Sequence, residues 1–298
     1  MTAKNSTVGN HLLSVENGLL NPLASAVRFS DYVVLFLTSG EGIFYADNCP
    51  FVFSGATLLF ATPLQVLRLE FQGTPSYTML RFHSDFYCIE THREEVACNG
   101  LLFNNIYIRP TIAITAAETV LFQQLIAQLS NELLQNTSEM VLRAYLQLIL
   151  AKASSIKLRL LDQVALSSGK DEQMERFRLL LDAHFLSLHQ PMDYAELLDL
   201  NAVQLRKKSL KYFGKTPSQL IQDRLILEAK KKLHLTTASI KEIAFQMAFS
   251  DAYYFSRFFK KHCGISPAVF RQRGGISEVA YLSMEKEVSS IVIPDLRP

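Results

Sequence analysis

The sequence predicts an α+β protein with two domains: an N-terminal β-barrel or β-sandwich with trailing helices, then an all-helical C-terminal domain. Three observations support this fold class. Short apolar runs, broken by Gly or Pro every 8 to 12 residues, fill residues 28–115. From Thr111 onward the apolar spacing becomes helical. A weak repeat with an offset of 50 residues occupies the last third of the chain. A length of 298 residues also suits two domains.

The predicted strands are rich in Val, Phe, Leu and Tyr. The stretch "DYVVLFLTSGEGIFYA" reads as strand, Ser-Gly turn and strand, and "PFVFSGATLLFATP", "LQVLRLEF" and "SYTMLRFHSDF" continue the pattern. These short runs between turn residues are typical of a sandwich or a small barrel.

Two long helices are predicted after the strands. Leucines recur at helical spacing in "AAETVLFQQLIAQLSNELLQ" and in "EMVLRAYLQLILAKASSIKLRLL". The second helix carries apolar residues over a broad face: one part must cover the β domain, and the rest is a candidate dimer surface. The polar stretch "SSGKDEQ" is the predicted linker. The predicted segments are therefore a first domain at 1–166, a linker at 167–173, a helical domain at 174–273 and a C-terminal extension at 274–298.

The repeat has matching helix ends. Leu205 and Phe255 are each followed nine residues later by Gly, at Gly214 and Gly264. Glycine at this place favours a left-handed helix stop. Thr216-Pro217 and Ser266-Pro267 then provide an N-cap and a proline in the first turn of a new helix. Two further boxes predict helix starts, Ser239 with Glu242 and, more loosely, Asp193 with Glu196.

The segment "FSDAYYFSRFFKKHCGISP" combines an apolar face with a cationic one. Phe255, Phe258 and Phe259 have the spacing of residues that face a core. Arg257 and Lys260 fall on other faces of the same helix. A helix-turn-helix requires a second helix of this kind, because that helix packs on its partner and also enters a major groove about 12 Å wide.

The charge distribution supports a nucleic-acid partner. Residues 173–273 contain 17 Lys/Arg and 9 Asp/Glu, a net +8, whereas the rest of the chain carries −6. A basic domain favours binding to a polyanion, although a solvated charged surface is the alternative.

The predicted DNA-contacting residues come from both repeats. They are Val203, Gln204, Arg206, Lys207, Tyr253, Ser256, Arg257 and Lys260. Arginine suits bidentate binding to guanine, and lysine suits phosphate. The helix from Pro217 to Leu233 would be a strut of about 25 Å between the two reading helices.

At this point the sequence resembles a known family. "SIKEIAFQMAFSDAYYFSRFFKKHCGISPAVFR" is similar to the C-terminal signature of AraC/XylS-type transcription regulators, and "MDYAELLDLNAVQLRKKSLKYFGKTPSQLI" is similar to their first helix-turn-helix. The resemblance covers about a hundred residues of this chain. Ala248 stands where the family usually has Gly, which requires a backbone there that is not strongly left-handed. Ser209-Leu210 stands where a bulky apolar residue and a cation are usual.

The resemblance implies the roles of the other parts. The N-terminal domain would be a cupin-like domain that binds a small effector, and its trailing helices would form a homodimer. Candidate residues of the effector pocket are Phe36, Phe44, Phe60, Phe82 and His83, with core packing as the alternative. The partners would be promoter DNA, the effector and, for an activator, RNA polymerase. No catalytic residue, cofactor or metal is expected for such a regulator.

Two other functions are weighed against this one. His83, Cys88, His92 and Cys98 cluster in the sequence, and such side chains can bind zinc, as a cupin-type metal-dependent enzyme with a DNA-binding appendage would require. The H-x-H pair of metal-binding cupins is absent. An effector-free regulator controlled by its abundance is the other alternative. The four cysteines lack CxxC spacing, the chain start is polar, and the longest uncharged run holds two prolines; we therefore expect a cytoplasmic protein without a membrane segment.

Overall fold

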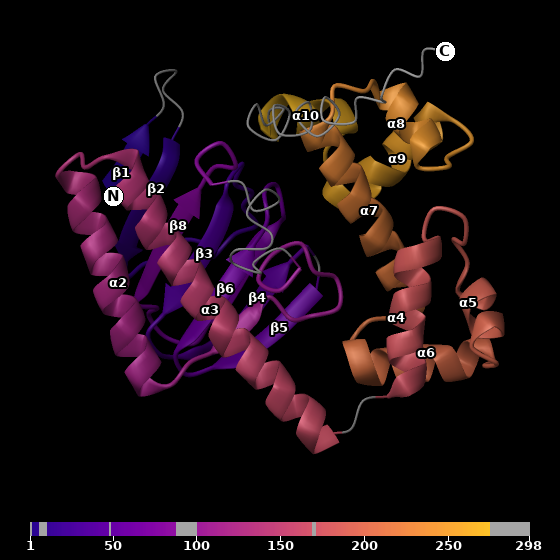
Figure 1. Cartoon of the computed structure of the whole chain (residues 1–298), viewed down its shortest axis with the longest axis horizontal. Helices are drawn as coiled ribbons and strands as arrows, with labels where there is room; N and C mark the ends of the chain where they lie inside the picture. The colour runs from indigo at the N-terminus through magenta and orange to yellow at the C-terminus, as the bar shows by residue number, and fades with distance from the viewer. Residues whose placement is uncertain (1, 6–10, 48, 88–99, 169–170, 275–298) are drawn as a thin grey trace, which may run out of the picture.

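The computed structural model describes residues 2–5, 11–47, 49–87, 100–168 and 171–274. It has the α+β architecture that the sequence predicts, with sheets and two long helices in the N-terminal part and a helical C-terminal part (Figure 1). The predicted extension 274–298 lies outside the described residues apart from Gly274.

The strands form two antiparallel sheets. One sheet has six strands in the order β1-β2-β8-β3-β6-β9, and the other has three strands in the order β5-β4-β7. The described strands thus form an open sandwich rather than a closed barrel, which confirms the sandwich alternative. Their bounds are β1 Thr2–Asn5, β2 His11–Gly18, β3 Tyr32–Leu37, β4 Glu41–Ala46, β5 Cys49–Ser54, β6 Thr57–Ala61, β7 Leu67–Phe71, β8 Tyr77–Phe82 and β9 Thr111–Ala113.

The six-stranded sheet begins earlier in the chain than the sequence predicts. β2 pairs with β8 from Leu13, opposite Phe82, to Gly18, opposite Tyr77. Leu13 and Val15 are buried. Their alternating pattern is short and lies beside polar residues, so the predicted β region starting at residue 28 missed this strand.

β3 lies at the centre of the N-terminal domain. All six of its residues are buried, and alternate residues point to opposite faces of the sheet. Val34 and Phe36 pack in the cluster that includes helices α2 (Ala116–Leu134) and α3 (Glu139–Ser168), whereas Val33 and Leu35 pack against the second sheet. The domain therefore has three layers, with α2 and α3 crossing one face of the larger sheet (Figure 1).

The C-terminal part is built around α7. This helix contacts α4, α5 and α6 of the first repeat and α8, α9 and α10 of the second. Leu220, Leu225 and Leu233 are buried along it, so both repeats share one core. The helices are α4 Glu172–His184, α5 Pro191–Leu197, α6 Ala202–Phe213, α7 Pro217–Leu235, α8 Ile240–Gln246, α9 Ala252–Cys263 and α10 Pro267–Gly274.

The predicted linker 167–173 overlaps the ends of two helices. α3 extends to Ser168 and α4 begins at Glu172, while residues 169–170 lie outside the described part. In the part of the chain that the structure covers, none of the helices has the length and apolar character needed to cross a membrane.

Candidate nucleic-acid interface

The first helix-turn-helix consists of α5, a tight turn and α6. Asp199 in the turn has φ +54°, and its N–H donates to the carbonyl of Glu196 at 3.1 Å. The N–H of Leu200 donates to Ala195 at 2.9 Å, so the two bonds complete a Schellman turn. Asn201 then caps α6 by accepting the N–H of Gln204 at 2.9 Å.

The second helix-turn-helix repeats this geometry with Ala248 at the left-handed position. Ala248 has φ +57°, and its N–H donates to Phe245 at 3.0 Å while Phe249 donates to Ala244 at 3.0 Å. The expectation that alanine here requires a backbone outside the left-handed region is therefore wrong. The turn keeps its left-handed residue because both Schellman bonds depend on it.

The predicted helix stops and starts are present with one exception. Gly214 and Gly264 end α6 and α9 with φ of +70° and +72°. Ser239 and Glu242 form the predicted capping box of α8. Asp193 is not an N-cap: its carboxylate accepts the N–H of Gln190 at 3.2 Å, within the first turn of α5. Pro191 begins that helix, so the box starts three residues earlier than predicted.

The α9 helix separates its apolar and cationic faces as predicted. Phe255 and Phe259 are fully buried, and Phe258 is half-buried, packing 5.3 Å from Phe249 between ring centroids. Tyr253 is 70% exposed, and the Arg257 guanidinium lies 5.5 Å above its ring. This contact presents a planar cation and an aromatic ring together on the open face of the helix.

The other two predicted DNA-contacting residues of α9, Lys260 and Ser256, differ in exposure and in hydrogen bonding. Lys260 is exposed near the C-terminal end of the helix. Ser256 is half-buried, and its hydroxyl donates to the Ala252 carbonyl at 2.8 Å. The hydroxyl oxygen still has lone pairs with which to accept a hydrogen bond. Cys263 ends the helix in the core, where burial raises the pKa of its thiol to about 11.

The α6 helix has the corresponding open face. Leu205 and Ser209 are buried, whereas Val203 is 77% exposed and Arg206 and Lys207 are exposed. The side-chain oxygen of Gln204 accepts the N–H of Asn201 at 3.0 Å, which leaves its amide NH₂ as the group available for another partner.

The two open faces correspond position by position at an offset of 50 residues. Val203 aligns with Tyr253, and Lys207 aligns with Arg257. Leu210 is 42% exposed where the second repeat has Lys260. Each repeat thus presents a different set of exposed side chains at equivalent positions.

The predicted effector-pocket residues lie on different layers of the N-terminal domain. Phe36, Phe60 and Phe82 are buried between the larger sheet and the helices, while Phe44 is buried between the two sheets. His83 lies beside Asp85 at 3.2 Å, and the hydrogen bond to this carboxylate raises its pKa. Phe60 lines a small cavity of about 110 Å³.

A larger cavity lies between the two domains. It has a volume of about 560 Å³ and is lined by Ser30, Thr62, Asn105 and Tyr107 on the N-terminal side and by residues of α4, α7 and α10 on the other. This cavity leaves no pattern in the sequence, because its walls come from segments far apart in the chain, such as Tyr107 and Asp182, which are 75 residues apart.

The predicted metal cluster is described only at His83. Cys88, His92 and Cys98 lie outside the described residues. Within the ranges that the structure covers, no group of three or more His, Cys, Asp or Glu side chains is placed to bind a metal ion.

Comparisons with known proteins match this geometry. A family model described as a helix-turn-helix domain matches residues 194–273, which span the second helix-turn-helix unit and the first one apart from the start of α5. The raffinose operon transcriptional regulatory protein RafR of Pediococcus pentosaceus is 23% identical over 258 residues, covering 82% of this chain and 86% of RafR. The transcriptional activator RhaS of Escherichia coli O139:H28 is 27% identical over 158 residues, covering 50% of this chain and 53% of RhaS.

A solved structure is similar to about a third of the chain. The Chromobacterium violaceum transcriptional regulator, described as an AraC-type DNA-binding domain-containing protein, is 25% identical, with a TM-score of 0.32. The match covers 36% of this chain and 96% of that one. With two capped helix-turn-helix units on a shared α7 and relatives that regulate transcription, the chain is a DNA-binding transcription regulator of the AraC type.

Proposed function

We propose that this regulator reads promoter DNA with α6 and α9 in successive major grooves and responds to a small anion bound between its domains. One observation carries the proposal: α6 and α9 each begin at a capped N-terminus and each bury one face in the core, which leaves the other face exposed at equivalent positions. The proposed DNA-contacting residues are Val203, Gln204, Arg206, Lys207, Tyr253, Ser256, Arg257 and Lys260. The protein acts by binding, and we assign it no enzymatic step.

The length of α7 supports reading of two adjacent grooves. Its 19 residues span about 28 Å at about 1.5 Å per residue. Successive turns of the major groove lie about 34 Å apart. A rigid helix of this length between the two repeats therefore matches the separation that both reading helices need. Since the partner is promoter DNA, we infer that the regulator acts in the cytoplasm.

The charges around the interdomain cavity favour an anionic effector. Arg224 lies between two carboxylates, Asp182 at 3.1 Å and Glu228 at 3.2 Å. Lys230 and Lys231 add two further cations to the wall formed by α7. Cations outnumber carboxylates there, so a carboxylate or phosphate group on a small molecule would be attracted. Leu227, Leu235 and Phe270 supply apolar contacts for the rest of such a molecule.

The position of the cavity provides a route from ligand to DNA. Its walls belong to both domains, so a ligand that touches both binds best to one interdomain arrangement. The favoured arrangement fixes how the DNA-binding domain is held, so the ligand changes the affinity of the protein for DNA. The ratio of DNA affinities with and without the ligand gives the coupling free energy.

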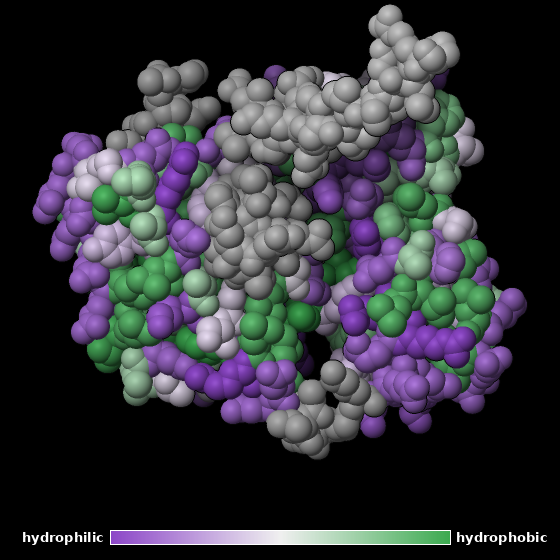
Figure 2. All heavy atoms as spheres, viewed as in Figure 1, coloured by the Kyte–Doolittle hydropathy of each residue, from purple (hydrophilic) through white to green (hydrophobic). Residues whose placement is uncertain are grey.

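We propose that the regulator is a homodimer that uses the outer surface of α2 and α3. Apolar side chains are exposed on these helices: Leu134 at 67%, Met140 at 78% and Leu158 at 47%. Figure 2 shows apolar surface over this part of the N-terminal domain. A dimer would cover part of it, and an activator would add a contact with RNA polymerase.

The DNA proposal is tested by selecting binding sites for the full-length protein from random duplexes. We expect a site with two recognised segments about one helical turn apart. Selection of a single short segment would contradict simultaneous reading by α6 and α9. If the selected duplexes share no sequence, the result would contradict specific recognition of DNA.

The effector proposal is tested by measuring thermal unfolding and DNA affinity with panels of organic phosphates, carboxylates and neutral sugars. Sugars belong in the panel because a relative is named for the raffinose operon. We expect an anion to raise the melting temperature of the wild type and to change its DNA affinity, with a weaker response in Lys230→Ala. The exposed Lys152→Ala on α3 is the matched control. A response to sugars alone would contradict the anionic class.

A further inference from the structure

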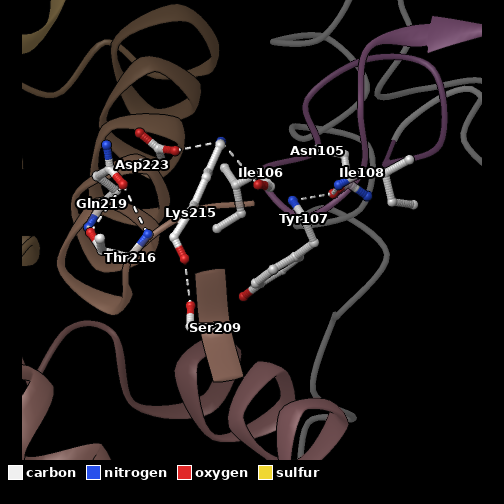
Figure 3. Close-up of polar contacts among 9 residues, drawn as sticks. All are labelled: Asn105, Ile106, Tyr107, Ile108, Ser209, Lys215, Thr216, Gln219 and Asp223. Atoms are coloured by element: carbon white, nitrogen blue, oxygen red, sulfur yellow. Dashed lines mark hydrogen bonds and ion pairs between the residues drawn. The ribbon is translucent and has the colours of Figure 1, made fainter. Parts of the chain in front are cut away.

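Lys215 joins three parts of the molecule immediately after the first recognition helix. Its ammonium donates to the carbonyl of Ile106 at 3.0 Å and pairs with Asp223 of α7 at 2.7 Å. Its own carbonyl accepts the hydroxyl of Ser209, in α6, at 2.6 Å. Figure 3 shows these contacts converging from α6, α7 and the segment that contains Ile106. The Lys215 side chain is only 16% exposed, so water competes weakly for its partners.

The N-terminal side of this contact is held in a fixed turn. The side-chain oxygen of Asn105 accepts the N–H of Tyr107 at 2.6 Å and of Ile108 at 2.9 Å (Figure 3). Such a turn around an asparagine fixes the backbone of the residues it spans. The Ile106 carbonyl therefore points to Lys215 from a backbone that is already ordered.

Tyr107 makes a second contact with the same helix end. Its ring lies 5.5 Å from that of Phe213, the last residue of α6. Its hydroxyl donates to Asp182 of α4 at 3.1 Å, and this carboxylate also accepts from Arg224. Burial raises the pKa of Tyr107 far above its usual range, so the hydroxyl stays a hydrogen-bond donor.

The apolar part of the contact belongs to the C-terminal core. Ile106 and Leu64, both from the N-terminal domain, are buried in the same cluster as the residues of α4 to α9. Ile106 is 9% exposed, so separating the domains would expose it to water. The segment thus combines a charge-assisted hydrogen bond, an aromatic contact and a buried aliphatic side chain at one end of α6.

The second repeat makes a different contact with the N-terminal domain. Residue 265, at the position equivalent to Lys215, is isoleucine. Near it, the guanidinium of Arg28 approaches Gly264 so closely that a side chain on residue 264 would collide with it. The N-terminal domain therefore contacts the C-terminal end of each recognition helix, and it holds α6 through the larger set of bonds.

We propose that Lys215 and Tyr107 are positioning residues through which the N-terminal domain sets the orientation of α6 on DNA. The contacts leave the N-terminal turn of α6 open, with Val203 and Arg206 exposed, so they orient the helix without covering its reading face. Recognition of the segment read by α6 then depends on the N-terminal domain more than recognition of the segment read by α9.

The test uses full-length variants and the DNA site selected for the wild type. Base pairs read by α6 are those where Arg206→Ala loses discrimination, and those read by α9 are assigned with Arg257→Ala. In Lys215→Met and Tyr107→Phe, we expect discrimination at the α6 base pairs to fall about tenfold, the effect of losing one charge-assisted hydrogen bond. Discrimination at the α9 base pairs should change less than about twofold.

Two controls separate positioning from general damage. Lys215→Arg keeps a cation that can donate to Ile106 and should restore most of the discrimination. Lys232→Met removes a lysine of α7 that bonds to Gln246 at 3.2 Å and should leave both segments unaffected. Tyr107→Phe removes a single hydroxyl, so it keeps the test valid if Lys215→Met does not fold.

The outcomes distinguish this inference from the effector proposal, on which it does not depend. Equal losses at both segments, or none, in folded Tyr107→Phe and Lys215→Met would overturn the positioning role. Hydrogen exchange without DNA or ligand gives an independent measurement. The amides of residues 105–108 and 213–216 should exchange faster in both variants, and unchanged exchange would also overturn it.

Discussion

The hydroxyl of Ser209 donates a hydrogen bond to the carbonyl of Lys215 at 2.6 Å, and the Ser209 side chain is fully buried. The equivalent residue in the second repeat is Phe259, whose ring packs 5.4 Å from that of Phe270. At this position the first repeat is therefore stabilised by a hydrogen bond to the chain after α6, and the second repeat is stabilised by packing between two aromatic rings. The serine that departs from the family pattern is thus a structural part of the first repeat.

Ser209→Ala should destabilise the protein. The substitution leaves the Lys215 carbonyl, in a part-buried place, without the hydroxyl donor, and loss of such a partner costs about 1–3 kcal/mol. We expect the free energy of unfolding, measured with urea, to fall by that amount. Ser130→Ala is the control, because its hydroxyl bonds to the Ile126 carbonyl within a continuous helix. Equal losses in the two variants would contradict a special role for Ser209.

The sequence predicted the C-terminal domain well because its signals are local. A helix cap, a left-handed glycine and an apolar period each depend on residues within a few positions of one another. Gly214, Gly264 and the Ser239 box could therefore be placed without the fold. The open faces of α6 and α9 followed from the same period, since Leu205 and Phe255 had to face inward.

The rest of the site depends on tertiary contacts that leave no local pattern. Ile106 and Lys215 are 109 residues apart in the chain. Lys215 lies inside the first helix-turn-helix signature, but nothing in that signature points to Ile106 as its partner. The interdomain cavity was missed for the same reason. β2 was missed because its apolar residues are few, and the larger sheet, through β8, is what makes it a strand.

Ala248→Gly should stabilise the second helix-turn-helix. Alanine at φ +57° has a conformation that costs an ordinary residue about 1–2 kcal/mol, whereas glycine adopts it freely. Glycine also raises the conformational entropy of the unfolded chain, and this effect offsets part of the stabilisation. We expect a net increase of about 1 kcal/mol in the free energy of unfolding.

Ala127→Gly provides the opposite control. Ala127 is exposed within α2, where the backbone is helical, so glycine should lower the free energy of unfolding by about 1 kcal/mol. A loss of stability in Ala248→Gly similar to that in Ala127→Gly would contradict the left-handed conformation of residue 248.

Arg257→Ala should reduce sequence discrimination. Arg257 is exposed beside Tyr253, where its guanidinium can reach a guanine edge. Loss of such a contact should cost about 1–3 kcal/mol at one base position, measured as the affinity ratio between the selected site and its single-base variants. An unchanged ratio would contradict the proposed placement of α9 in the groove.

Lys260→Ala should weaken binding to all sequences alike. A lysine on phosphate neutralises one charge, so its loss lowers the slope of log affinity against log salt by about one. Lys152→Ala, on the exposed surface of α3, is the matched control and should leave the slope unchanged. Loss of discrimination at a single base pair in Lys260→Ala would instead indicate a base contact.

Lys157 should make stability depend on pH in the alkaline range. Its ammonium is buried on α3 and donates to the carbonyls of Arg109 and of Thr111, at 2.7 Å for the latter. Burial, together with the Arg109 charge, lowers the pKa of Lys157 from 10.5 to about 8. Between these values the unfolded chain holds the proton and the folded chain has lost it. Stability therefore rises with pH in this window, because the unfolded state binds more protons.

The measurement compares the wild type with Lys157→Met, since tyrosines and cysteines titrate in the same range and cancel in the difference. The free energy of unfolding of the wild type should rise relative to the variant, with a slope that approaches about 1.4 kcal/mol per pH unit above pH 8. Lys152→Met, at an exposed position of the same helix, is the control for the loss of a lysine side chain that has no buried ammonium. A difference between wild type and Lys157→Met that stays flat or falls with pH would show that Lys157 keeps its proton in the folded state, and the two backbone carbonyls would then be sufficient to hold a buried ammonium.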